Sequence, residues 1–278
     1  MSEDRGASRS AALVAACRML AAELPDHERL IDDPFAHLVV DDTAIAAARA
    51  DRPLQNVIRL RTRYIDDAVT SFVAANAGSS PQVLLLGAGL DARAFRMRLD
   101  ATFFEVDFPA TLDLKAQLLA DAAPTAPRIV VPVDLAATSF VAPLVDAGYR
   151  ASRPTIVVWE GVINYLDAAT AESVVEQIGR ALAAGSQLVA DYVEMAWFKG
   201  APFERSTAGI AARLRDGGEP LRAGLPDAHA TLGRHGFDVI DDQATEELRP
   251  RYGLDPCARH YPARMFTAVR RPDPVLPH

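Results

Sequence analysis

Two glycines, Gly87 and Gly89, stand one residue apart directly after the apolar run Val83–Leu86. Four consecutive apolar residues predict a short strand that is buried on both faces. Glycines at the end of a strand permit a tight turn and remove the Cβ atoms that would keep a ligand away from the backbone. The free N–H groups of a helix that follows can face polar ligand atoms. This pattern predicts the nucleotide-binding corner of a doubly wound sheet, although several cofactor classes share it.

Asp107 ends a second apolar run, about twenty residues after the glycines, where a carboxylate that binds ribose is expected. An ionised carboxylate has two acceptor oxygens and can bind both ribose hydroxyls. Glu105 projects to the same side of the strand but lies further from its end. We therefore interpret Asp107 as the ribose ligand and Glu105 as a solvated residue.

Short apolar runs alternate with helical stretches along most of the chain, which is typical of a βαβ series. Right-handed crossovers would bring the strand ends together along one rim, with Gly87, Asp107, Asp134 and Glu160 on it. The last two runs have no long helix between them, so we expect an antiparallel pair. The fold class is α/β, a seven-stranded doubly wound Rossmann-like sheet. The predicted strands are 83–86, 102–107, 128–133, 155–159, 186–192, 236–240 and 264–269.

Arg61 lies within the apolar stripe of a long helix predicted from Pro53 to about Ala75. Arginine is rarely buried without a partner. It therefore either extends along the edge of the core or meets an anion, and the sequence supports both roles equally. Arg63 projects to the other side of the helix, where Asp66 and Asp67 are available to form a surface salt bridge with it.

The chain divides into an N-terminal helical cap, residues 1–78, and a sheet domain, residues 79–278. Residues 8–24 predict an amphipathic helix of the cap. An insertion at about 195–230 breaks the alternation of strands and helices and contains several aromatic residues. Long insertions are often functional lids, and we expect one here.

The composition argues against several classes of partner. A net charge of −8 and a pI near 5.3 disfavour an extended surface for nucleic acid or for an anionic membrane. Two cysteines give no disulfide framework, and no apolar run is long enough to span a bilayer, so a cytoplasmic protein is expected. Cys257 and His260 lack a second pair of ligands, so no metal site is expected.

Several motifs in this order resemble the leucine carboxyl methyltransferase family of class I S-adenosyl-L-methionine-dependent methyltransferases. This family includes many actinobacterial methyltransferases and the polyketide carboxyl O-methyltransferases of the tetracenomycin type, which act in natural product biosynthesis. The resemblance covers residues 28–195 well and the late strands loosely. The motifs are Leu86-Gly87-Ala88-Gly89-Leu90-Asp91-Ala92-Arg93, Phe104-Glu105-Val106-Asp107-Phe108-Pro109, Arg29-Leu30-Ile31-Asp32-Asp33-Pro34-Phe35, Arg61-Thr62-Arg63-Tyr64 and Glu160-Gly161-Val162-Ile163-Asn164-Tyr165-Leu166.

The resemblance implies S-adenosyl-L-methionine as the cofactor. It implies that Gly87 and Gly89 lie along its methionine and ribose portions and that Asp107 binds the ribose. Asp134 would accept a hydrogen bond from the adenine amino group, and the N–H of Leu135 would meet a ring nitrogen.

At the methionine end, the resemblance implies that Glu160 lies near the cationic amino group. Either Arg61 or Arg63 would face the methionine carboxylate and the acceptor; the helical stripe favours Arg61, and the motif spacing allows Arg63. Tyr165 would lie near the acceptor, unless it is an ordinary half-buried aromatic residue. Asn164 differs from the eukaryotic members, so the acceptor stays open.

The expected activity is methyl transfer to a carboxylate of a small molecule or of a peptide terminus, and the resemblance is compatible with a homodimer. A carboxylate is ionised near pH 7 and needs no general base. The alternative is an NAD(P)-dependent oxidoreductase, which is disfavoured because Lys115 and Lys199 are the only lysines and no Tyr-x-x-x-Lys motif is present. A non-catalytic binding protein is a third hypothesis, and the intact set Gly87, Gly89 and Asp107 argues against it.

Overall fold

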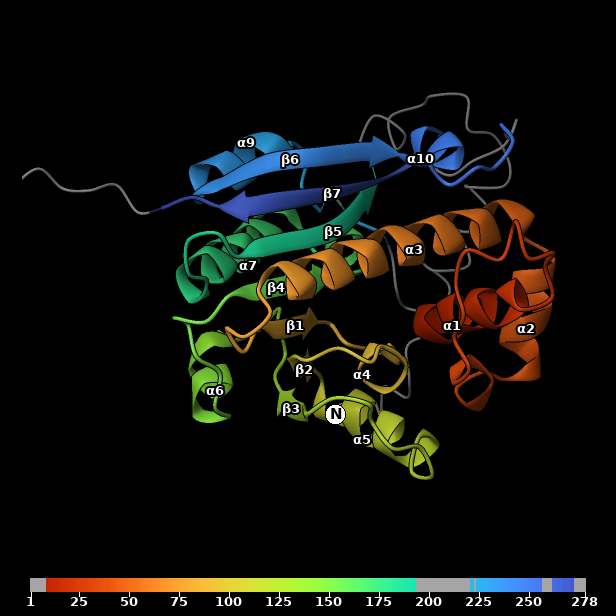
Figure 1. The fold of residues 1–278 in the computed structure, drawn as a ribbon, viewed down its shortest axis with the longest axis horizontal. Coiled ribbons are helices and arrows are strands. Elements are labelled where there is room, and N and C mark those ends of the chain that lie inside the picture. Colours follow the sequence, from red (N-terminus) through yellow and green to blue (C-terminus); the bar gives the residue numbers. More distant parts are fainter. Residues whose placement is uncertain (1–8, 194–220, 223, 257–261, 273–278) are drawn as a thin grey trace, which may run out of the picture.

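A computed structural model describes residues 9–193, 221–222, 224–256 and 262–272. A seven-stranded sheet with the order β3-β2-β1-β4-β5-β7-β6 runs through its centre (Figure 1). All neighbouring strands are parallel except β7, which is antiparallel to both β5 and β6, so the predicted antiparallel pair is confirmed. The strands are β1 (Gln82–Leu86), β2 (Thr102–Asp107), β3 (Arg128–Pro132), β4 (Thr155–Trp159), β5 (Gln187–Val193), β6 (Phe237–Ala244) and β7 (Ala263–Arg270).

Helices cover both faces of the sheet, which explains why β1 and β4 are buried along their whole length and apolar after their first residues, Gln82 and Thr155. Helices α3, α4 and α10 pack on one face, and α6, α7 and α9 pack on the other. The α-helices are α1 (Arg9–Ala21), α2 (Asp42–Arg49), α3 (Arg52–Ala75), α4 (Arg93–Arg96), α5 (Pro109–Leu118), α6 (Val141–Asp146), α7 (Ala168–Ala181), α9 (Ala228–Arg234) and α10 (Thr245–Arg251). Two 3₁₀ turns, η1 (Ala36–Leu38) and η2 (Ile163–Tyr165), complete the described elements.

The longest described helix, α3, positions much of the site. Asp51 caps its first turn by accepting a hydrogen bond from the Leu54 N–H at 3.1 Å. Its apolar stripe packs on the sheet, with Leu60, Ile65 and Val69 fully buried. Figure 1 shows α3 lying across the sheet with α1 and α2 beside one of its ends.

Several predicted boundaries shift, and three short helices, among them α9, were not predicted. The first helix ends at Ala21 rather than at residue 24, α2 occupies a stretch without a prediction, and α10 lies in the connection between β6 and β7. Most of the predicted lid at 195–230 lies outside the described residues. Within the described part of the chain, no helix is both long and apolar enough to cross a membrane.

The interpretation of Glu105 as a solvated residue is wrong. Its side chain is fully buried, with Oε2 at 2.9 Å from Nζ of Lys115 and 2.7 Å from Nη2 of Arg128. Helix α5 returns over the sheet and brings Lys115 into the interior beside β2. A buried carboxylate is tolerated here because two cations neutralise it.

Candidate cofactor and acceptor site

A cavity of about 730 Å³ lies at the carboxyl ends of the parallel strands, where strand order reverses between β1 and β4. Ligands of open α/β sheets bind at such a reversal, in pockets of roughly 300–1,000 Å³. The walls come from the turns after β1, β2, β3 and β4 and from helices α1 and α3. The predicted site residues that line it are Arg61, Gly87, Gly89, Asp107, Asp134, Leu135, Glu160 and Tyr165.

The turn after β1 requires glycine. Gly87 has a φ of +69° and Gly89 a φ of +43°, in the left-handed region that other residues rarely adopt. A Cβ atom on Gly87 would lie 2.5 Å from Cγ2 of Val162, which follows β4. The turn therefore passes close to its neighbour and leaves backbone atoms exposed to the cavity.

Asp107 lies at the end of β2 and holds this turn in place. Its Oδ2 accepts a hydrogen bond from the Gly89 N–H at 2.6 Å, and its Oδ1 accepts one from the Phe108 N–H at 2.6 Å. Burial raises the pKa of the Asp107 carboxyl, and the two backbone donors oppose that rise. A carboxylate held by backbone donors beside a glycine turn keeps lone pairs for hydroxyl groups of a ligand.

Asp134 and Leu135 follow β3 and line the cavity beyond Asp107. Oδ1 of Asp134 accepts a hydrogen bond from the Ala136 N–H at 2.9 Å, which fixes the carboxylate within its own turn. The second oxygen is left for a donor from a ligand. Their role in binding adenine stays a prediction.

Arg61 lines the cavity from α3 and is only 7% exposed. Nε lies 2.9 Å from Oε1 of Glu160, and Nη1 lies 3.1 Å from Oδ2 of Asp191. Burial alone would lower the pKa of Arg61, but Asp191 and Glu160 outweigh it and raise the pKa above its ordinary value. Arg61 is therefore buried and paired with carboxylates of the protein itself, and its role in binding a ligand stays a prediction.

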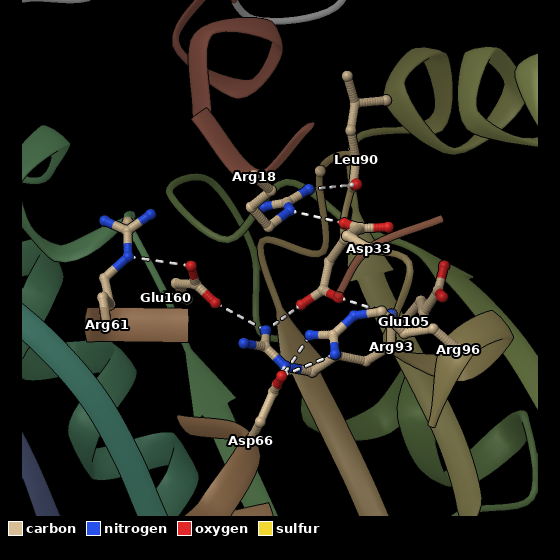
Figure 2. Close-up of polar contacts among 12 residues, drawn as sticks. Arg18, Asp33, Arg61, Asp66, Leu90, Arg93, Arg96, Glu105 and Glu160 are labelled. Atoms are coloured by element: carbon tan, nitrogen blue, oxygen red, sulfur yellow. Dashed lines mark hydrogen bonds and ion pairs between the residues drawn. The ribbon is translucent and has the colours of Figure 1, made fainter. Parts of the chain in front are cut away.

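Glu160 lies between two arginines (Figure 2). Its second oxygen accepts a hydrogen bond from Nη1 of Arg93 at 2.6 Å, in addition to the bond from Arg61. Burial alone would raise the pKa of Glu160, but Arg93 and Arg61 hold it well below its ordinary value. The same interactions continue to Asp66, which bonds Nε of Arg93 at 2.7 Å.

These residues belong to one arginine–carboxylate cluster that joins α1, α3, α4 and the ends of β4 and β5. Its members are Arg18, Asp33, Arg61, Asp66, Asp91, Arg93, Arg96, Glu160 and Asp191. Arg18 ties α1 to the glycine turn by donating to the Leu90 carbonyl at 3.0 Å (Figure 2). The cluster therefore fixes the wall of the cavity that contains Arg61 and Glu160.

Arg63 does not line this cavity. Its Nε donates to Asp67 at 2.8 Å, and both side chains are about 40% exposed, so the predicted surface salt bridge is confirmed. Of the two candidate arginines, Arg61 is therefore the one that can reach a ligand here.

The turn η2 forms the wall next to Glu160, and both Asn164 and Tyr165 line the cavity from it. Oδ1 of Asn164 accepts a hydrogen bond from the Val193 N–H at 3.1 Å. The backbone of η2 also pairs with a later segment, since the Arg222 N–H donates to the Asn164 carbonyl at 2.6 Å. The half-buried Tyr165 lines the cavity, and its place near an acceptor stays a prediction.

The sequence reasoning assigned no role to Arg93, Asp191 or the face of α1 that lines the cavity. Arg93 was visible as the last residue of the glycine motif, and it is 1% exposed. Asp191 lies near the end of a strand, and the expectation that acidic residues at strand ends meet on the rim could have identified it. No feature of the sequence indicated that α1 reaches the glycine turn, because that contact depends on the path of the chain through residues 22–51.

The sequence pattern of the leucine carboxyl methyltransferase family matches residues 11–179. The chain belongs to this family. The match contains the glycine turn, Asp107, η2 and every member of the cluster except Asp191, so it includes most of the cavity wall.

Relatives in mycobacteria support the same assignment. A protein of Mycolicibacterium smegmatis is 36% identical over 200 residues, which is 65% of this chain and 65% of the relative. A protein of Mycobacterium avium is 35% identical over 257 residues, which is 84% of this chain and 75% of the relative. Each is named a "Putative S-adenosyl-L-methionine-dependent methyltransferase". This family member is accordingly an S-adenosyl-L-methionine-dependent methyltransferase.

Solved structures confirm the fold. A "putative methyltransferase" of Thermobifida fusca superposes with a TM-score of 0.65 at 19% identity and covers 97% of each chain. A DUF574 family protein of Streptomyces avermitilis superposes with a TM-score of 0.60 at 15% identity and covers 96% of this chain and 98% of the other. The predicted α/β class I methyltransferase fold is confirmed.

The residues present fit the cofactor. The Gly87 turn lines the cavity, Asp107 offers acceptors for ribose, and Nη2 of Arg61 has no protein partner in the described part of the chain. Among the described residues, no group of three or more side chains could hold a metal ion.

Proposed function

We propose that this methyltransferase acts on oxygen and that its acceptor is a carboxylate of a small molecule or of a peptide terminus. The observation that supports this is the absence of a free base around Arg61. Glu160 and Asp191 are both paired with arginine, and within the described residues no histidine lines the cavity. A carboxylate arrives ionised near pH 7, whereas a phenol or an ammonium group must first lose a proton.

We further propose a role for each part of the cavity. Asp107 binds the ribose hydroxyls, while Asp134 and the Leu135 N–H bind the adenine. Nη2 of Arg61 binds the methionine carboxylate, and Glu160 lies near the methionine amino group.

S-adenosyl-L-methionine supplies a methyl group already activated by its sulfonium sulfur. The protein then has to align an acceptor oxygen with that group, and orientation of this kind can lower a barrier by roughly 7–11 kcal/mol. Tyr165, on η2, lies beside the acceptor in this arrangement.

Transfer of a labelled methyl group tests the chemistry. Wild-type protein with methyl-labelled cofactor and simple carboxylic acids should give a product that releases labelled methanol in mild alkali, because methyl esters hydrolyse there. Methyl ethers and methylamines are stable under the same conditions. A labelled product that survives alkali would contradict carboxylate methylation.

Calorimetry tests the assignment of the cavity. S-adenosylhomocysteine should bind and NAD should not; the comparisons give no support to the oxidoreductase alternative. Asp107→Ala removes two acceptors for ribose hydroxyls. Each hydrogen bond to a charged group contributes about 1.5–3 kcal/mol, so the affinity for S-adenosylhomocysteine should fall at least 100-fold. Asp113→Ala, an exposed change on α5, is the control. Equal affinity of the two variants would contradict the ribose assignment.

A further inference from the structure

The side-chain amide of Asn164 has a fixed orientation. A backbone N–H can bond only to the oxygen of an amide, so the bond from Val193 assigns Oδ1 to that side. The nitrogen Nδ2, with its two N–H groups, then points the other way. It has no hydrogen-bond partner in the described part of the chain, and it is not fully buried. Since Asn164 is 8% exposed and lines the cavity, Nδ2 is the end that faces it.

Strand β5 holds both Arg61 and Asn164 near its carboxyl end. The Asp191 side chain accepts a hydrogen bond from Arg61, and the Val193 N–H donates one to Asn164. Residues two apart on a strand lie about 6.6 Å apart. Arg61 and Asn164 both line the cavity, so the guanidinium and the amide are two donors held by nearby positions of one strand.

Another part of the cavity wall is apolar. Leu13 and Val14 of α1 and Leu54, Val57 and Ile58 of α3 line the same cavity. These residues offer no hydrogen bonds, so they suit the apolar body of an acceptor whose polar group is turned toward η2 and β5.

We propose that Nδ2 of Asn164 donates a hydrogen bond to the non-reacting oxygen of the acceptor carboxylate and so selects apolar carboxylic acids; this rests on the proposed carboxylate function. One carboxylate oxygen forms the new bond to the methyl carbon, and the carbon–sulfur bond breaks with its electron pair going to sulfur. The positive charge of the sulfonium and the negative charge of the carboxylate cancel, and no proton is released. The second oxygen becomes the ester carbonyl and keeps its hydrogen bond to Asn164 throughout.

Two substitutions separate this role from a structural one. Asn164→Asp keeps an oxygen for the Val193 N–H but replaces the donor with a negative charge that repels a carboxylate. Asn164→Ala loses the bond to Val193 as well as the donor. If Asn164 only anchors η2 to β5, the alanine variant is the worse of the two. If it binds the acceptor, the aspartate variant is the worse.

The assay uses benzoate, octanoate and N-acetylleucine as acceptors with labelled cofactor. For those acids that the wild type methylates, kcat/KM should fall about 10-fold in Asn164→Ala and at least 100-fold in Asn164→Asp, mainly through KM, because the bond is present before and during transfer. The dissociation constant of S-adenosylhomocysteine should change by less than about threefold, since the bond is to the acceptor. Asn76→Asp, the same chemical change at the end of α3, controls for the added charge.

The outcomes distinguish the two proposals. Aspartate and alanine variants that fall in the opposite order, or a large loss of S-adenosylhomocysteine affinity in Asn164→Asp, would overturn the role of Asn164 and leave carboxylate methylation standing. A wild-type protein that methylates none of the three acids would overturn both.

Discussion

Glu160 shows how buried charges are accommodated in this site. Moving a carboxylate out of water is unfavourable unless its charge and its lone pairs are satisfied. Each oxygen of Glu160 accepts a hydrogen bond from a different arginine, Arg61 on α3 and Arg93 on α4. One side chain therefore links two helices to the end of β4, and the position of Arg61 in the cavity depends on that link.

Replacing Glu160 with glutamine should destabilise the protein by about 3 kcal/mol, because it leaves buried arginines short of an anion. The matched control is Glu176→Gln, which breaks an exposed pair with Arg180 and should change stability by less than about 0.5 kcal/mol. Urea unfolding at pH 7 measures both. Equal midpoints for the two variants would show that the cluster adds nothing to stability.

A comparison of the wild type with Glu160→Gln also predicts how the stabilisation by Glu160 depends on pH. The pKa of Glu160 lies below its value in the unfolded chain, about 4.3, because the arginines outweigh burial. Its contribution to stability is therefore present above that pH and is lost as the pH falls toward the folded value. The difference in unfolding free energy between wild type and Glu160→Gln should shrink as the pH falls below about 4.

Among the elements, the turn after β1 is the most constrained. Gly87→Ala should lower the stability of the fold for two reasons. The positive φ costs about 1–2 kcal/mol in alanine, and the new Cβ would lie 2.5 Å from Val162. Gly148→Ala is the control, since Gly148 has a φ of +100° but no atom within 4 Å of a Cβ there. Gly87→Ala should be the more destabilised variant in urea, and adding Val162→Ala should recover part of the difference. No recovery would mean that the contact with Val162 is not the cause.

The elements also show what the sequence could and could not predict. The strands were predictable because sheets covered on both faces need continuous apolar runs, and β1 and β4 provide them. The meeting of the strand ends along one rim was predictable because parallel strands run in the same direction. The environments of charged residues were not: Arg61 pairs with carboxylates 99 and 130 residues away, and Glu105 is buried because Lys115 returns over β2. Such contacts follow from the three-dimensional path of the chain and leave no local pattern.

At the scale of the whole molecule, the site is shared between the N-terminal helices and the sheet. Helix α1 contributes Ser10, Ala11, Leu13 and Val14 to the cavity that also contains Gly89 and Asp107. Arg18 connects the same helix to Leu90, directly after the glycine turn. A ligand that fills the cavity should therefore stabilise two parts of the chain that are far apart in sequence.

Hydrogen exchange can measure this coupling. S-adenosylhomocysteine at 100 times its dissociation constant stabilises the folded state by about 2.7 kcal/mol, and local opening of the elements that contact it should slow. We expect slower exchange in α1 as well as in residues 86–92, because opening α1 would remove one wall of the cavity. Helix α10 packs beside β6 and β7 and does not line the cavity, so it serves as the internal control. Protection of residues 86–92 with unchanged exchange in α1 would show that the cofactor is bound by the sheet alone, and that α1 contributes only to the acceptor side.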